Sequence, residues 1–341
     1  MAEDPAAPVT LLAAAKIGGA NIGARWQDGL AQPMSLPGRG HAIIHAPGGK
    51  ALFVSRRPGF FAAVVDPRDP AAPPQVVPPA EGCVFSGHAA ISPDGLLVTS
   101  EFASDTLQAR AIPRDLATGK PAGAWALPGI EPHDMVFAHG GATLVVAVGG
   151  LVKDGGVAGP AFNPDGVDSS LAEVDAKNGA ILKRHKLAPE HASLSLRHLG
   201  LSPDGRRVAF AMQDQDLGER RPLVGVLEVG GEVTLLPLPD PQACDFRGYV
   251  GSIAYDRSGQ YIAATSPRGS VVGLWSGADG RWLGGLRIND VCGLAQGRRP
   301  GEFWASSGLG EVVRLEASSA GLTAVRRWSG DAGFDNHLLM V

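Results

Sequence analysis

The sequence predicts an all-β fold, a seven-bladed β-propeller of four-stranded antiparallel blades. A phrase of apolar strand, small turn and apolar strand recurs along the 341 residues. Glycine (47 residues) and proline (27 residues) are abundant, as expected where tight turns join many short strands. Helical periodicity is nowhere sustained. These three observations together indicate a repeat architecture whose units stack to share a core.

Six copies of the repeated hairpin are complete. They are HAIIHAPGGKALFVS from His41, HAAISPDGLLVTS from His88, HDMVFAHGGATLVVA from His133, HLGLSPDGRRVAFAM from His198, VGSIAYDRSGQYIAATS from Val250 and VCGLAQGRRPGEFWASS from Val291. The first two intervals, of 47 and 45 residues, match the roughly 40–50 residues of a propeller blade. The interval from His133 to His198 is 65 residues and contains a Gly/Asp/Pro-rich insertion over residues 149–170, which we expect to be an extended loop.

Each blade is expected to hold strands A to D, counted outwards from the central channel. Segments FFAAVVD and PQVVPP supply the outer strands after the first hairpin, and LVGVLEV and VTLLPLP do so after the fourth. Hairpins also need residues that adopt positive φ, and Gly or Asn supplies this conformation most readily. The sequence provides such turn pairs at Asp94-Gly95, Asn178-Gly179, Asp204-Gly205 and Asp279-Gly280.

The two ends of the chain complement each other. The last segment, HLLMV from His337, is an A strand with nothing after it, whereas VTLLAAAKIG, ANIGARW and AQPMSLP near the start look like B, C and D strands. Joined, they make one blade and leave no open sheet edge. We therefore predict a flexible N-terminus over residues 1–8 and a single propeller over residues 9–341.

Composition narrows the function classes. A chain that is 44% hydrophobic and 19% charged is not mainly disordered. A net charge of −4 without a basic block argues against nucleic acid as a partner, and no apolar run approaches the roughly 20 residues of a membrane helix. Cys83, Cys244 and Cys292 form no CxxC pair, and whether two of them form a disulfide stays open. The start MAEDPAAP favours an exported chain whose signal was replaced, and the alternative is an ordinary flexible N-terminus of a cytoplasmic protein. We expect a monomer.

Five of the nine histidines are predicted at the first position of an inner strand, in blades 1, 2, 3, 4 and 7. Inner strands line the channel, so the imidazoles should form an arc at one mouth, with a gap at blades 5 and 6. Neutral imidazole binds zinc, copper and iron. The predicted metal ligands are His41, His88, His133, His198 and His337. His41, His88 and His337 form the favoured first shell, with Asp335 or Glu101 beside it; a haem is less favoured. The competing interpretation is that each histidine only bonds neighbouring strands.

Loops from the B to the C strands should surround the same mouth. They suggest cofactor-binding residues, which are Arg56, Glu101, Gln213 and Arg268. A nucleophile formed by Cys292 and His337 is conceivable, but a buried inert thiol is favoured. The chain has no G-x-S-x-G elbow, P-loop or H-E-x-x-H motif, so no residue is assigned as catalytic.

Nine segments resemble a bacterial family known as domain-of-unknown-function 1513. They are RGH (39–41), RRPG (56–59), SGHAAISPDG (86–95), PHD (132–134), RHL (197–199), RGYVGSIA (247–254), TSPRG (265–269), DVCG (290–293) and DNH (335–337). The resemblance implies a Tat-exported seven-bladed propeller, distantly similar to lactonase and YVTN-repeat propellers. It also implies a neighbourhood of imelysin-like proteins and a dihaem oxidoreductase in iron uptake.

Three functions follow as hypotheses. The leading one is a non-catalytic periplasmic propeller that binds a transition metal (iron, copper or zinc) or a metal cofactor through its channel histidines in iron acquisition. The second is a lactonase-like hydrolase, with a channel histidine as base, Arg56 or Arg268 holding an anionic substrate and Glu101 assisting proton transfer. The third is a platform that docks a partner protein.

Overall fold

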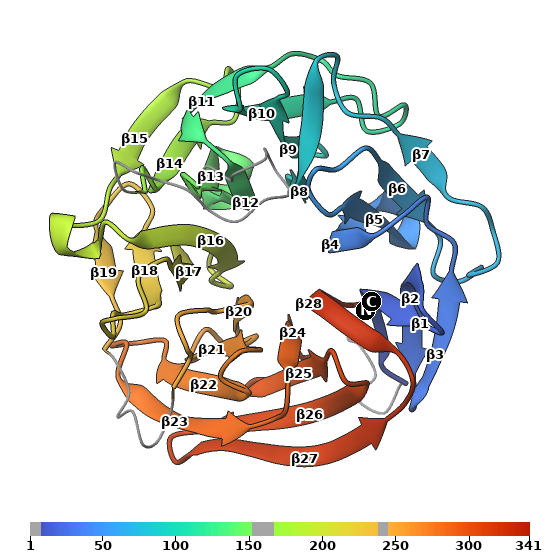
Figure 1. Cartoon of the computed structure of the whole chain (residues 1–341), viewed down its shortest axis with the longest axis vertical. Coiled ribbons are helices and arrows are strands. Elements are labelled where there is room, and N and C mark those ends of the chain that lie inside the picture. The colour runs from blue at the N-terminus through green and yellow to red at the C-terminus, as the bar shows by residue number, and fades with distance from the viewer. Residues whose placement is uncertain (1–7, 152–166, 238–244) are drawn as a thin grey trace.

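The computed structural model describes residues 8–151, 167–237 and 245–341. Its strands form seven separate sheets of four antiparallel strands each, arranged in a circle around a central channel (Figure 1). The predicted seven-bladed propeller is confirmed. No helix long and apolar enough to cross a membrane occurs among the described residues.

The first three complete blades in chain order follow the predicted A-to-D order. Blade 1 contains β4 (Gly40–Ala46), β5 (Lys50–Ser55), β6 (Ala62–Val65) and β7 (Gln75–Val77). Blade 2 contains β8 (Cys83–Ile91), β9 (Leu97–Ala103), β10 (Gln108–Arg114) and β11 (Trp125–Ile130). Blade 3 contains β12 (Pro132–Ala138), β13 (Thr143–Val148), β14 (Ser170–Asp175) and β15 (Ile181–His185).

The next three blades have the same order. Blade 4 contains β16 (Leu194–Leu201), β17 (Arg207–Asp214), β18 (Val224–Glu228) and β19 (Val233–Leu235). Blade 5 contains β20 (Ser252–Tyr255), β21 (Tyr261–Ser266), β22 (Val271–Ser276) and β23 (Trp282–Arg287). Blade 6 contains β24 (Val291–Gln296), β25 (Glu302–Ser307), β26 (Glu311–Ser318) and β27 (Gly321–Ser329).

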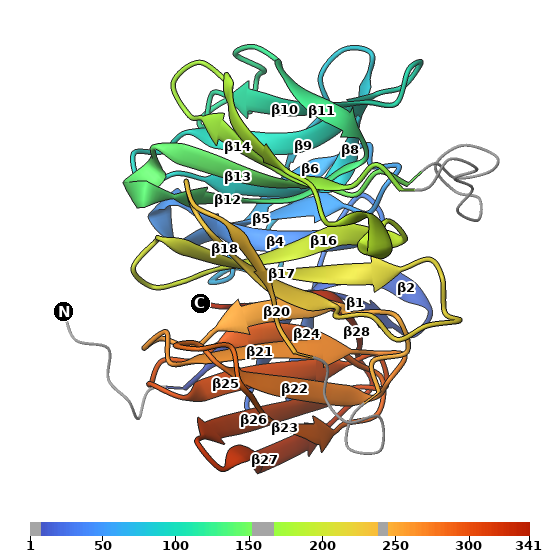
Figure 2. The ribbon, with the colours of Figure 1, turned by 90° about the vertical axis from the view of Figure 1, so that its left-hand side faces the viewer.

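Blade 7 joins the two ends of the chain. Its strands are β28 (Gly333–Met340), β1 (Thr10–Ile17), β2 (Ala20–Gln27) and β3 (Leu30–Met34). Strand β28 pairs antiparallel with β1, with Leu12 opposite Leu339, and both views show the two strands side by side (Figures 1 and 2). The circle therefore closes with three N-terminal strands and one C-terminal strand, as predicted, and no blade is left with an unpaired inner edge.

Burial changes across each blade. The second strands are buried on both faces, and in β13 (TLVVAV) every residue is buried and all but Thr143 are apolar. The outermost strand β27 alternates exposed and half-buried residues. A strand packed between two neighbouring blades must be apolar on both faces, whereas an edge strand meets water on one side. The core therefore lies between the blades and around the channel.

The predicted turn glycines have the expected conformation. Gly95, Gly179, Gly205 and Gly280 all have positive φ, which costs glycine little. At Gly179 a Cβ atom would also lie 2.1 Å from Cγ of Trp125, so that no larger residue fits this turn. The hairpins thus fix where each inner strand begins.

Candidate functional site

Irregular pairing of the inner strands places the histidines in the channel. In six blades the register between the inner strand and its neighbour shifts at a short segment; blade 5 shows no such shift in its described pairing. Five of these segments contain the predicted histidines, namely His41, His88, His133, His198 and His337. A bulge turns a side chain away from the regular alternation of a strand, and here it points the imidazole to the axis.

This finding corrects one expectation. His41 and His133 are second in their strands, but His88, His198 and His337 lie well inside β8, β16 and β28. These three strands begin earlier than the hydrophobic pattern suggested. The bulge, and not the first position of the strand, is what the five histidines share.

Polar side chains form hydrogen bonds with the backbone groups at these bulges. The amide of His88 donates to Ser100 Oγ (3.1 Å), and that hydroxyl donates to the carbonyl of His88 (3.0 Å). Asp134 accepts a hydrogen bond from the amide of Leu199 in the next blade (2.9 Å). Buried backbone groups that lose their ladder partner need such replacements. The irregular geometry is therefore built into the fold.

The five side chains, which we call the channel histidines, form a compact cluster, in which the rings of His88 and His337 also lie 4.8 Å apart. Neighbouring imidazole centroids lie 5.1 Å (His41–His88), 4.7 Å (His88–His133), 5.0 Å (His133–His198), 4.9 Å (His198–His337) and 4.7 Å (His337–His41) apart. The expected arc with a gap is wrong in this respect, because His198 and His337 meet across blades 5 and 6. Those two blades contribute no imidazole and leave the space that the contact needs.

The ring nitrogens of the channel histidines have unequal surroundings. Nδ1 of His88 lies 3.1 Å from Asp134 Oδ1, and Nδ1 of His41 lies 3.6 Å from Asp335 Oδ1. Nδ1 of His133 instead lies 3.2 Å from Nη1 of Arg197. Four buried nitrogens of these residues have no hydrogen-bond partner, namely His41 Nδ1, His88 Nε2, His198 Nδ1 and His337 Nε2. Buried polar atoms are rarely left so, and their clustering here indicates room for a ligand.

Burial favours the neutral form of four channel imidazoles, those of His41, His133, His198 and His337. It lowers the pKa of His41 to about 4, against the raising effect of Asp335. Burial, together with neighbouring Arg197 or other channel histidines, also lowers the pKa values of His133, His198 and His337 well below the usual range. A neutral imidazole offers a lone pair, which is the form that binds a metal ion.

Two groups of three channel histidines could hold a metal ion. They are His41, His88 and His337, and His88, His133 and His198; within each group one donor atom per residue lies within 4.8 Å of the others. Nitrogens bound tetrahedrally to one ion are about 3.4 Å apart, because each metal–nitrogen bond is about 2.0–2.1 Å. A modest inward turn of the imidazoles is enough to close either group around an ion.

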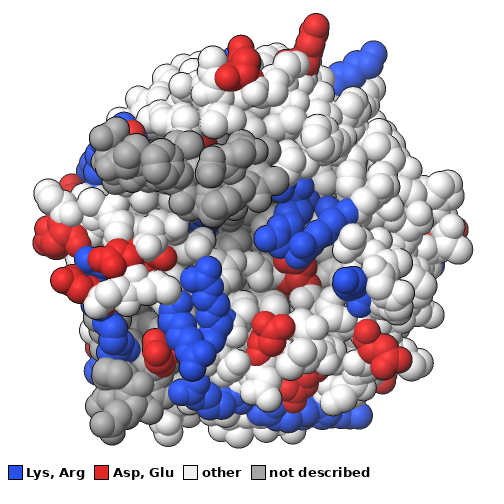
Figure 3. Space-filling model, viewed as in Figure 1, with Lys and Arg blue, Asp and Glu red and all other residues white. Residues whose placement is uncertain are grey.

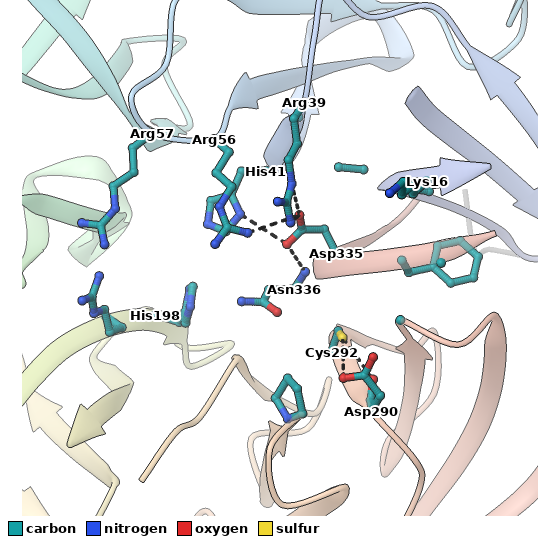
Figure 4. Close-up of a pocket in the computed structure, with 18 of the residues that line it drawn as sticks. Lys16, Arg39, His41, Arg56, Arg57, His198, Asp290, Cys292, Asp335 and Asn336 are labelled. Carbon is teal, nitrogen blue, oxygen red and sulfur yellow. Dashed lines mark hydrogen bonds and ion pairs between the residues drawn. The ribbon is translucent and has the colours of Figure 1, made fainter. Parts of the chain in front are cut away.

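A cavity of about 730 Å³ opens above the channel histidines. His41, His133 and His198 line it, together with the predicted residues Arg56, Gln213 and Arg268. Figure 4 shows His41 beside Asp335, which also contacts Arg39 and Arg56. The structure thus brings together all five predicted metal ligands and three of the four predicted cofactor-binding residues.

Glu101 is the exception. It lies inside β9, is fully buried and pairs with Arg114 of β10. Its oxygens also accept hydrogen bonds from Thr99 (2.7 Å) and the amide of Ala80 (2.8 Å). Glu101 does not line the cavity, because its strand continues past the predicted loop boundary. Its partners give it a structural role within blade 2.

Several site residues lie outside the predicted ligand set. Glu131 is buried against Arg57 and Arg197, and its contact with Arg197 is 2.6 Å. Asp134, which faces His88, also belongs to this set. Glu131, Asp134 and Arg197 each stand within two residues of a channel histidine in the sequence. This adjacency is the signal that could have found them.

Cys292 lies in the bulge of β24 and lines the cavity. Its thiol donates to the carbonyl of Asp290 (3.0 Å), and burial, with the nearby Asp290 carboxylate, raises its pKa to about 12. These observations favour the inert thiol over a nucleophile. Cys83 and Cys292 are both free. Cys244, most of residues 1–8 and most of the 149–170 insertion lie outside the described residues.

Comparison with known proteins identifies the family. The family model described as a protein of unknown function, DUF1513, matches residues 34–341, and the chain belongs to this family. No curated protein matches it. Among solved structures, hydrazine synthase of Kuenenia stuttgartiensis is similar, with a TM-score of 0.66, 15% sequence identity and 90% of each chain covered. At this identity the likeness shows the fold alone.

Proposed function

We propose that this DUF1513 propeller binds one transition-metal ion in its channel, on His41, His88 and His337, as a binding protein without catalytic activity. The observation that carries the proposal is the cluster of five closely packed imidazoles with unpartnered buried nitrogens. A buried polar group without a partner costs about 1–3 kcal/mol. A metal ion would satisfy several such groups at once.

The tautomers distinguish the two groups of three. The carboxylate of Asp134 accepts from Nδ1–H of His88, which leaves a bare lone pair on Nε2 of that ring. Asp335 Oδ1 lies on the same side of the His41 ring, 3.6 Å from Nδ1, which is beyond hydrogen-bond distance. Carboxylates that hold the second nitrogen of a ligand histidine fix its orientation and raise its basicity. His88 is therefore set to donate through Nε2, and the carboxylate near Nδ1 favours the same tautomer in His41.

His133 has the opposite tautomer. Arginine only donates hydrogen bonds, so Nδ1 of His133 accepts from Arg197 and carries no proton. The neutral imidazole then holds its proton on Nε2, which cannot bind a cation. The guanidinium of Arg197 would also repel a metal ion at this position. We therefore assign the metal to His41, His88 and His337 and leave His133 and His198 outside its ligand set.

The imidazole set favours an ion and not a haem. Three neutral imidazoles suit zinc, copper or iron(II). A porphyrin between two of the channel histidines would need the volume that the other three rings fill, since their centroids lie 4.7–6.3 Å apart. A periplasmic place in iron acquisition, with an imelysin-like protein or a dihaem oxidoreductase as partner, is part of the proposal and follows from the family resemblance. The lactonase hypothesis assigned proton transfer to Glu101. This carboxylate is instead paired with Arg114 inside blade 2 and is not available for that role.

Metal analysis of three chains tests the proposal. The parent, a His41→Ala/His88→Ala/His337→Ala variant and a matched His133→Ala/His198→Ala variant are stripped with chelator and titrated separately with Zn(II), Cu(II) and Fe(II). Circular dichroism establishes that each chain is folded. We expect one equivalent of metal in the parent and in the matched variant, and none in the triple variant at micromolar concentrations.

Two results would count against it. If the parent binds no metal at micromolar concentration, the proposed metal site is refuted. Retention by the triple variant with loss in the matched variant moves the metal to the second group and refutes the tautomer assignment.

A further inference from the structure

Positive charge is concentrated around the cavity above the channel histidines. Among the described residues that line it, six are basic and two are acidic; they are Lys16, Arg39, Arg56, Arg57, Arg197 and Arg268, and Asp290 and Asp335. This excess is local, because the whole chain has a net charge of −4. Figure 3 shows Lys and Arg side chains gathered on two sides of the hollow in this face. A cleft lined by one sign of charge attracts ligands of the opposite sign.

The acidic groups do not neutralise this charge. Asp335 is shared by Arg39 (2.8 Å) and Arg56 (3.8 Å), and Glu131 behind the wall is shared by Arg57 and Arg197. Each carboxylate thus faces two guanidinium groups.

Three basic side chains around the cavity have N–H donors that no carboxylate in the described part of the chain accepts, and Arg197 is one of them. The buried Nε of Arg197 has no hydrogen-bond partner. Arg268 lies over the ring of Tyr249 at 5.1 Å, and neither it nor Lys16 has an ion pair among the described residues. Guanidinium groups with free N–H donors are suited to carboxylate or phosphate oxygens.

Size and shape narrow the ligand class. A volume of about 730 Å³ is typical of sites for organic ligands, whereas one water occupies only about 30 Å³. Inorganic phosphate would leave most of the cavity to water. The two aromatic residues that line the cavity offer no free face for a nucleotide base, since Arg268 covers Tyr249 and Phe334 is buried.

We propose that this cavity binds an organic polycarboxylate anion, with its outer carboxylates on Arg56, Arg57 and Arg268. Its inner end lies next to His41, where a carboxylate oxygen reaches a position that three imidazoles leave open on a metal ion. Only this inner contact rests on the proposed metal site. The outer contacts need the arginines alone, so the anion also binds to the metal-free chain.

Calorimetric titration of the metal-free protein tests the outer contacts. The probe is propane-1,2,3-tricarboxylate, which has three carboxylates and chelates metals weakly, with inorganic phosphate as the comparison. We expect micromolar binding of the tricarboxylate, at least tenfold weaker binding of phosphate, and a marked loss of affinity when salt rises from 50 to 200 mM. Arg56→Gln/Arg268→Gln should weaken tricarboxylate binding at least tenfold.

Arg326 provides a matched control. It is exposed and lies over the ring of Trp328 at 4.5 Å, so Arg326→Gln also removes a cation from an aromatic face, but away from the cavity. Its affinity for the tricarboxylate should stay within twofold of the parent. Absence of tricarboxylate binding, or an equal loss in Arg326→Gln, overturns the anion site.

A fourth chain separates this proposal from the metal site. The His41→Ala/His88→Ala/His337→Ala variant should keep the metal-free affinity for the tricarboxylate, whether or not the parent binds metal. If the parent binds metal but no chain binds the tricarboxylate, the anion site fails alone. If the parent and the triple histidine variant bind the tricarboxylate equally, Arg56→Gln/Arg268→Gln binds it at least tenfold more weakly, and no chain binds metal, the anion site stands and the metal site fails.

Discussion

A single buried histidine in blade 3 and the five channel histidines are built in opposite ways. His185 in blade 3 contacts Glu173 at 2.7 Å, and the same carboxylate accepts the amide of Gly230 in blade 4 at 2.9 and 3.1 Å. Every polar atom in that contact has a partner. The channel histidines pack against one another, with ring centroids of neighbours 4.7–5.1 Å apart, yet four of their buried nitrogens have no hydrogen-bond partner.

This difference in hydrogen bonding distinguishes His185, which joins two blades, from the channel histidines, whose free nitrogens can bind a ligand. Where the fold needs stability it pairs imidazole with carboxylate, as at His185. In the channel, the carboxylate contacts among the described residues are to His41 and His88, and both are at Nδ1. Unsatisfied buried groups destabilise a fold, so their concentration at one point indicates a function that outweighs the cost.

The largest effect is expected at the satisfied pair. His185→Ala leaves the buried carboxylate of Glu173 without its imidazole, and breaking a buried pair costs about 3–5 kcal/mol. We expect the free energy of unfolding, measured by urea denaturation, to fall by that amount, while metal content per folded chain stays at the parent value. A loss of metal in this variant would erase the distinction between His185 and the channel histidines.

The second-largest effect is expected from acid, which should destabilise the fold by protonating channel histidines. The pKa of His41 is about 4 in the folded chain against 6.5 for the free side chain, so between these values the unfolded state binds the proton and the folded state does not. Stability is therefore full above about pH 6.5 and falls as pH decreases towards 4, by about 3 kcal/mol for this residue. His133, His198 and His337 shift in the same direction and steepen the loss.

Denaturation of the metal-free protein between pH 7 and pH 4 measures this loss of stability. Asp335 faces His41, and Arg39 and Arg56 contact Asp335. The profile is therefore compared with that of His41→Gln, which should be flatter. A profile in the parent that is flat from pH 7 to 4 would contradict neutral, buried imidazoles.

The fold could be predicted because its signals are local and repeated. In a hairpin such as HAAISPDGLLVTS, the residue pattern indicates both strands and the turn between them. The complementary strands at the two ends, Thr10–Ile17 and Gly333–Met340, allow the closure of the ring to be deduced. The starts of β8, β16 and β28 were missed because their first residues, such as Phe85 and Leu196, precede the bulge. A strand interrupted by a bulge loses its period-two pattern.

The candidate site was predicted only as a set of residues. Equivalent positions in adjacent blades indicated that the five imidazoles would meet, but their distances depend on how far each bulge turns the side chain. The closure from His198 to His337 depends on the absence of an imidazole in blades 5 and 6. The burial of Glu101 depends on Arg114, thirteen residues away on the next strand, and a single sequence does not state such a pairing.

Metal should stabilise the folded protein only when the channel ligands are intact. At a metal concentration 100 times Kd, binding to the folded state adds about 2.7 kcal/mol. His337→Ala should abolish this gain, because it removes a ligand. The metal-free stability should change by no more than about 1 kcal/mol, since loss of packing is offset by removal of an unpartnered buried nitrogen. Urea denaturation with and without metal measures both quantities, and a metal-free loss above 3 kcal/mol would place His337 with His185 as a structural residue.

The smallest effect tests how the carboxylate of Asp134 acts on His88. Asp134→Asn keeps an oxygen for the amide of Leu199 but removes the charge that holds Nδ1–H of His88. Loss of such a partner lowers metal affinity about 10–100-fold. Asp204→Asn is the matched control, because Asp204 accepts a backbone amide in a blade 4 turn and should leave the affinity unchanged. Nitrogen NMR of the metal-free chain provides a second readout, because His88 should be protonated on Nδ1 in the parent and should mix both tautomers in Asp134→Asn. Unchanged affinity with an unchanged tautomer would mean that Asp134 only holds the backbone of blade 4, and the preference for His41, His88 and His337 over the second group would lose its physical basis.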